Sequence, residues 1–130
     1  MSEPTLSDEL REQVSAAISA IRREIRWKPG KDAEHLQTRK RYGHLRPDAT
    51  FTEYQAIIST ILHAESAELY IFTWQDDIYP TVVAAYEGTI WLVMFNLSGV
   101  LETAFPPTDA KNYLADERFR YLGSVKEFLA

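Results

Sequence analysis

The segment from His35 to Arg46 contains most of the side chains that could perform acid–base chemistry on a charged substrate. It holds two of the three histidines and four of the fourteen Lys and Arg residues. Between Arg22 and Arg46, nine basic residues face three acidic ones, a local charge of +6 in a chain whose net charge is −5. Histidine moves protons near neutral pH and the cations attract phosphate, so the segment suits a polyanionic substrate. A solvated, charged helix face is the alternative interpretation.

Metal-independent RNA cleavage is the chemistry that these residue types fit. The reaction needs a base for the 2′-hydroxyl proton, an acid for the leaving oxygen and a fixed cation for the charge on the phosphorane. His35 and Arg39 are four residues apart, so on a helix they share one face. Thr103, from the second half of the chain, can donate a hydrogen bond to a phosphate oxygen. The predicted catalytic residues are His35, His44, Arg39, Arg41 and Thr103.

Four other residues are predicted to hold nucleic acid without reacting with it. Lys40 and Arg46 belong to the same basic segment and can contact phosphates. Trp74 and Tyr79 stand near predicted strand ends, where an aromatic ring can stack on a base. An ordinary place in the core or on the sheet surface is the alternative for both rings.

Apolar periodicity and capping signals predict three helices in the first half of the chain. Apolar residues recur every three or four positions from Leu6 to Ile25, and Pro29-Gly30 is a strong breaker. Gly43 suits the left-handed end of a second, short helix. Thr50 and Glu53 have capping-box spacing before a strongly apolar face. The predicted helices cover about 6–27, 32–42 and 51–63.

Short runs of β-branched and aromatic residues, separated by turn residues, predict an antiparallel meander after Glu68. The run 89–95 is apolar on both faces and should be an internal strand. Glu87-Gly88 should form a tight hairpin turn with a positive φ at Gly88. Pro106-Pro107 should end this part of the sheet. The predicted elements are strands at 69–74, 79–86, 89–95 and 100–105, a short helix at 109–116 and an edge strand at 119–122.

Together these elements predict an α+β fold, with N-terminal helices packed on one face of an antiparallel sheet of four or more strands. A length of 130 residues suits one domain, 1–130, with a helical half at about 6–63 and a sheet half at about 68–122. The absence of cysteine excludes disulfides, thiolate catalysis and cysteine-based zinc sites. No Gly-rich phosphate loop, serine elbow or zinc-binding helix motif occurs, so neither a cofactor nor a metal site is expected.

Composition also bounds the location and the partners. No apolar run approaches the roughly 18 residues of a membrane span, so no membrane partner is expected. The amino terminus has no secretory signal pattern, and a cytoplasmic location is the expectation. A pI near 5.2 argues against a protein dedicated to nucleic-acid binding, apart from its segregated basic segment.

Two segments of this chain resemble the barnase/EndoU/colicin/RelE-like group of small ribonucleases, whose members include phage proteins and polymorphic toxins. The first is the early helix with His35 followed by the element Arg-Lys-Arg-Tyr-Gly-His, and the second is the late strand Gly-Val-Leu-Glu-Thr-Ala-Phe-Pro at 99–106. The resemblance covers about residues 31–107. It implies an endoribonuclease that uses a helix-borne histidine, basic residues and the hydroxyl of Thr103, and it implies an inhibitory protein partner.

A binding module without catalysis is the main alternative function. Outside the basic segment 22–46 the rest of the chain has a net charge of −11. Such an acidic body suits an immunity protein or antitoxin that neutralises a basic toxin. An interaction domain of another kind is a third possibility. Convergence of His35, His44 and Thr103 at one place would favour the enzyme.

Overall fold

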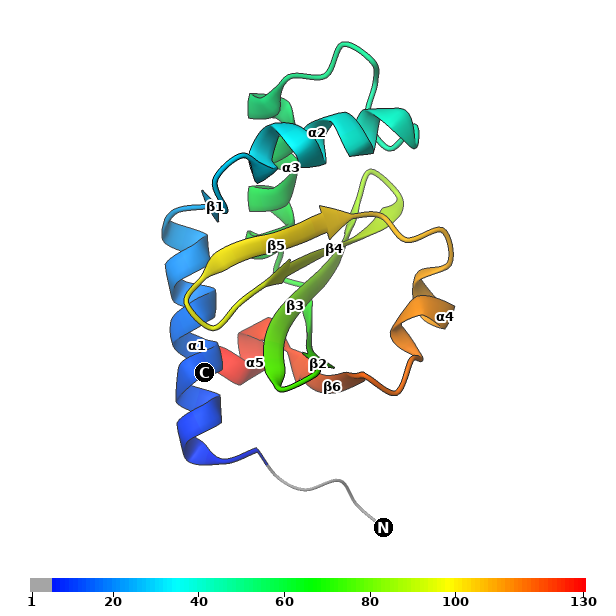
Figure 1. Ribbon diagram of the computed structural model, residues 1–130. Helices are drawn as coiled ribbons and strands as arrows, with labels where there is room; N and C mark the ends of the chain where they lie inside the picture. The colour runs from blue at the N-terminus through cyan, green and yellow to red at the C-terminus, as the bar shows by residue number, and fades with distance from the viewer. Residues whose placement is uncertain (1–5) are drawn as a thin grey trace.

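The computed structural model describes residues 6–130 and has an α+β fold built on one six-stranded sheet (Figure 1). The strand order is β1-β5-β4-β3-β2-β6, antiparallel except for the β1–β5 pair. The elements are α1 (Asp8–Arg23), β1 (Arg26–Trp27), α2 (Lys31–Arg41), α3 (Phe51–His63), β2 (Glu68–Trp74), β3 (Asp77–Tyr86), β4 (Thr89–Phe95), β5 (Val100–Phe105), α4 (Ala110–Leu114), β6 (Phe119–Ser124) and α5 (Val125–Leu129). The predicted fold class is confirmed.

Helices α1, α3 and α5 cover one face of the sheet, and α2 lies beside its β5 edge (Figure 1). The main core forms between these helices and the sheet, with Ile18, Tyr54, Ile58 and Phe95 among its fully buried side chains. A smaller apolar cluster lies on the other face, around Leu92. Strand β4 is therefore internal and apolar on both faces, as its sequence predicts.

The first helix ends earlier than its periodicity predicts. Ser7 caps α1 by accepting a hydrogen bond from the N–H of Leu10 (3.1 Å), but Glu24 is already extended (φ −154°, ψ 124°). Arg26–Trp27 then pairs in parallel with Val100–Leu101 as β1. The prediction of a helix to residue 27 was wrong because this long-range pairing outweighs the local helical pattern.

The second and third helices and the central strands agree closely with prediction. Thr50 caps α3 through the N–H of Glu53, and Gly43 after α2 has a φ of +74°. The last elements differ by a few residues: α4 is shorter than the predicted 109–116, with Asp109 as its cap, and β6 extends to Ser124. Among the described residues, no helix is both long and apolar enough to cross a membrane.

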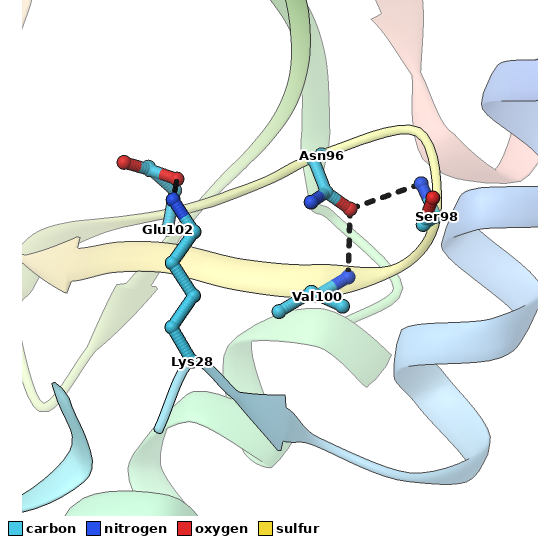
Figure 2. Close-up of polar contacts among 5 residues, drawn as sticks. All are labelled: Lys28, Asn96, Ser98, Val100 and Glu102. Carbon is cyan, nitrogen blue, oxygen red and sulfur yellow. Dashed lines mark hydrogen bonds and ion pairs between the residues drawn. The ribbon is translucent and has the colours of Figure 1, made fainter. Parts of the chain in front are cut away.

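Two tight turns join the central strands. Glu87 (φ +48°) and Gly88 (φ +80°) connect β3 to β4, and two successive positive φ angles define a type I′ hairpin turn. The predicted conformation of Gly88 is confirmed. Between β4 and β5, the Asn96 side-chain oxygen accepts hydrogen bonds from the N–H groups of Ser98 (2.9 Å) and Val100 (3.0 Å), as Figure 2 shows.

The second turn also packs closely against α1. Gly99 has a φ of +78°, and a Cβ added there would lie 2.9 Å from the Cβ of Ala20. Gly88 has nearly the same φ, but a Cβ added there would meet nothing within 4 Å. The two glycines therefore separate the cost of backbone strain from the cost of crowding.

Gly88→Ala should lower the free energy of unfolding by about 1 kcal/mol, because alanine fits a positive φ poorly. Gly99→Ala should cost roughly 1–3 kcal/mol more, because its methyl group also overlaps α1. Urea denaturation of both variants measures the difference. Equal losses would contradict the close approach of this turn to α1.

Candidate functional site

The path of the chain around α2 brings His44 back to Arg39. The positive φ of Gly43 ends the helix and reverses the chain, so the N–H of His44 donates to the carbonyl oxygen of Arg39 (2.9 Å). A nitrogen of the Arg39 guanidinium also lies 2.9 Å from Nδ1 of His44. The sequence left the direction of His44 open, and the structure places it against the helix.

Arg39 is a buried cation without an anionic partner. The residue is only 8% exposed, and its guanidinium carbon lies 5.2 Å from the centroid of the Phe105 ring. No carboxylate among the described residues forms an ion pair with it, and its Nε has no hydrogen-bond partner there. Burial lowers its pKa. Since arginine stays charged in proteins, this site holds an uncompensated positive charge.

The contact with Arg39 fixes the form of His44. Guanidinium N–H groups only donate hydrogen bonds, so Nδ1 of His44 must accept and the ring must be neutral with its proton on Nε2. Burial, followed by the charge of Arg39, lowers the pKa of His44. The ring also faces Tyr42, with centroids 5.9 Å apart and an interplanar angle of 26°. His44 therefore orients Arg39.

His35 lies one helical turn before Arg39 and is half-buried. Its ring centroid is 5.9 Å from that of Trp27. Burial lowers the pKa of His35, the charge of Arg39 lowers it further, and the carboxylates of Glu34 and Glu102 act in the opposite direction. His35 makes no side-chain hydrogen bond to the part of the chain that the structure describes. The lowered pKa favours the uncharged imidazole at neutral pH, which is the form that can accept a proton.

Thr103 lies in β5, the strand beside α2 (Figure 1). Helix α2 and strand β5 run in the same direction (Figure 1). In the middle of β5, the charge of Glu102 opposes the lowering of the His35 pKa, and at the end of the strand Phe105 contacts the guanidinium of Arg39. Thr103, which is half-buried, stands between these two positions. The structure therefore brings the helix-borne residues and the strand that contains Thr103 to one edge of the sheet.

Three basic residues of the predicted site lie away from Arg39 or have other partners. Arg41 is exposed and, two residues after Arg39, falls on another side of α2. Arg46 forms ion pairs with Asp48 (3.7 Å) and Glu53 (3.3 Å). Lys40 is half-buried beside Arg39 in sequence but off its face of the helix.

The two predicted stacking residues differ in their surroundings. Trp74 ends β2 and is 48% exposed, with the guanidinium of Arg118 5.4 Å from its ring centroid. Tyr79 is half-buried on β3 against Phe72, at a centroid distance of 6.5 Å. The ring of Trp74 is open to a ligand, whereas Tyr79 is part of the smaller apolar cluster.

An ion pair between Lys28 and Glu102 adds two residues that the sequence analysis missed (Figure 2). Their hydrogen bond is the main cause of a raised pKa of Lys28. Glu102 lies where the register of the β4–β5 pair shifts, between the partners of Met94 and Phe95. Strand alternation alone would not place Glu102 beside both Lys28 and His35, because the irregularity changes its direction.

Two hollows flank this edge of the sheet. A hollow of about 680 Å³ begins at His44 and continues between α3 and the β3–β4 turn. A smaller one, about 300 Å³, is lined by Lys28, Tyr79 and Glu102. His35, Arg39 and Thr103 line neither hollow, but the larger one reaches His44, which contacts Arg39, and the smaller one reaches Glu102, the residue before Thr103. Each hollow therefore adjoins a direct neighbour of the candidate site residues.

Within residues 6–130, no group of three or more His, Asp or Glu side chains could hold a metal ion. Comparison of the chain with models of known families, with curated proteins and with solved structures found no match.

The two depressed histidine pKa values predict a pH-dependent stability. An unfolded histidine has a pKa of about 6.5, so as the pH falls below that value the unfolded chain takes up protons before folded His35 and His44 do. The free energy of unfolding should fall between pH 7 and pH 5. In His35→Gln/His44→Gln it should fall less steeply, because neither position then titrates. Urea denaturation at both pH values measures the two slopes, and equal slopes would contradict the histidine assignment.

Proposed function

We propose that this protein is a metal-independent endoribonuclease whose site lies between α2 and β5. The observation on which the proposal rests is the buried guanidinium of Arg39, which has no carboxylate partner among the described residues. An unpaired buried charge is costly to stability, so a site that keeps one is suited to an anionic ligand. A phosphodiester supplies that anion, and bidentate contact with phosphate is a property of arginine.

The neighbouring groups fit cleavage of RNA by its own 2′-hydroxyl. Neutral His35 accepts the 2′-hydroxyl proton, the 2′-oxygen attacks phosphorus, and the bond from phosphorus to the 5′-oxygen breaks. Arg39 and Thr103 stabilise the phosphorane oxygens. The proton taken by His35 is then returned to the leaving 5′-oxygen. In this scheme His44 orients Arg39 through Nδ1, which accepts a hydrogen bond from the guanidinium. Its Nε2–H can therefore donate a hydrogen bond to the substrate.

A protein-binding module is the second candidate function. The net charge of −11 outside the segment 22–46 favours an acidic surface that attracts a basic protein. Such a module needs neither an uncharged His35 nor an unpaired Arg39. The two candidates therefore differ in what replacement of Arg39 should do.

Arg39→Met should abolish RNA cleavage while leaving the free energy of unfolding unchanged or raised. Methionine keeps much of the volume of the side chain and removes an uncompensated buried charge, which is often stabilising. Loss of the phosphate cation should lower kcat by ~10²–10³. Cleavage of a fluorogenic RNA oligonucleotide and urea denaturation measure the two effects. A variant that is less stable but still active would contradict the proposal.

His35→Ala should lower the rate of cleavage by ~10²–10⁴, because it removes the proton-transfer group. Arg41→Ala is the matched control, since Arg41 is exposed on another side of α2, and its rate should stay near that of the wild type. Cleavage should persist in EDTA. A purified wild-type protein that cleaves no RNA would favour the protein-binding module.

A further inference from the structure

The larger hollow lies next to the proposed site but is not used by its chemistry. It has a volume of about 680 Å³ and is lined by residues of α3, of the β3–β4 turn and of the loop that joins α2 to α3. His44 lines its near end, and Pro106, the residue after β5, lines it as well. His44 therefore touches both this space and the guanidinium of Arg39.

The lining combines an apolar floor with a polar rim. Ile57 and Trp91, both almost completely buried, belong to the floor. The half-buried ring of Tyr86 stands at the side. Glu53 from α3 and Glu87 from the hairpin turn place carboxylates at the rim. A planar group with apolar faces and N–H donors on its edge would match both parts of this lining.

The charges at the rim distinguish between the parts of an RNA chain. Arg46 also lines the hollow and pairs with Glu53, whereas no ion pair among the described residues neutralises Glu87, so the rim has a net negative charge that disfavours a phosphate. A nucleobase is uncharged, stacks on aromatic rings and presents N–H groups that carboxylates accept. The phosphate would remain with Arg39.

We infer that this hollow is a nucleobase subsite, which holds the base of a nucleotide next to the phosphodiester bound at Arg39. This inference rests on the proposed function. The base stacks against Tyr86 over the floor formed by Ile57 and Trp91, and Glu53 and Glu87 accept hydrogen bonds from its edge. The subsite sets the position of the scissile bond relative to His35.

Strand β4 offers a matched pair of variants for the test. Thr89 lines the hollow, whereas Ile90 is the next residue and points to the opposite face of the sheet. Both are exposed, and tryptophan is a favourable strand residue at either position. Thr89→Trp should fill the hollow. Ile90→Trp adds the same side chain outside it.

Nucleosides are the appropriate binding probe, because they have no phosphate and do not engage Arg39. In a titration with adenosine, guanosine, cytidine or uridine followed by NMR, the indole N–H resonance of Trp91 should shift. Thr89→Trp should abolish the shift of the Trp91 resonance, and Ile90→Trp should retain it.

The same variants give a kinetic test. Thr89→Trp should raise KM for an RNA oligonucleotide roughly tenfold, the loss expected for one stacked base, whereas Ile90→Trp should cleave as the wild type does. If nucleosides leave Trp91 unshifted and Thr89→Trp has an unchanged KM while Arg39→Met is inactive, the subsite is wrong and the proposed function stands. If the wild type cleaves no RNA, the proposed function fails, and an unshifted Trp91 resonance would then refute base binding as well.

Discussion

The parallel pairing of Arg26–Trp27 with Val100–Leu101 is the constraint on which the candidate site depends. It brings the chain from α1 across to β5 and fixes the starting point of α2. Trp27 then packs on Phe51 and Tyr54, with ring centroids 5.5 Å and 5.7 Å apart. The hydroxyl of Tyr54 donates to the carbonyl oxygen of Ala104 (2.7 Å), so α3 is held to the same strand. Both helices that border the site are thereby positioned relative to β5.

The uncompensated charge of Arg39 shows how this scaffold differs from an ordinary core. The rings of Tyr42 and Phe105 near its guanidinium provide attraction through their π faces, at centroid distances of 6.0 Å and 5.2 Å. Such contacts do not replace the hydrogen bonds that a buried guanidinium loses. The hydrogen bond to Nδ1 of His44 replaces one of these lost hydrogen bonds. The structure therefore keeps Arg39 in place by packing and orientation, and leaves its charge for a ligand.

The sequence was most informative where local signals determine the structure. The capping pair Thr50 and Glu53 and the doubly apolar β4 run predicted α3 and the centre of the sheet within a residue. The four-residue spacing of His35 and Arg39 also predicted a shared helix face correctly. Each of these signals depends mainly on neighbours in the chain, and at these positions no long-range pairing opposes it.

The predictions from sequence were wrong or incomplete where contacts between distant segments determine the structure. Nothing near Arg26 indicates a strand, because its partner is at Val100. The role of Glu102 depends on a register shift, and the burial of Arg39 depends on Phe105. Basic residues of one segment were treated alike, yet Arg39 is buried while Arg41 is exposed. Charge counting along a sequence cannot make this distinction, since burial is set by tertiary packing.

The position of β1 also determines which part of the protein unfolds locally most easily. Strands β2 to β5 form a meander of neighbours with short loops, whereas β1 joins residue 26 to residue 100 and consists of two residues at the sheet edge. Short edge pairings that close long loops separate before a central meander does, so this corner belongs to the low-stability end of the native ensemble. Amide hydrogens of β1 and α2 would then exchange with solvent sooner than those of β3 and β4. Partial opening would dismantle the site while the sheet stays folded, which couples ligand binding to the ordering of one corner of the protein.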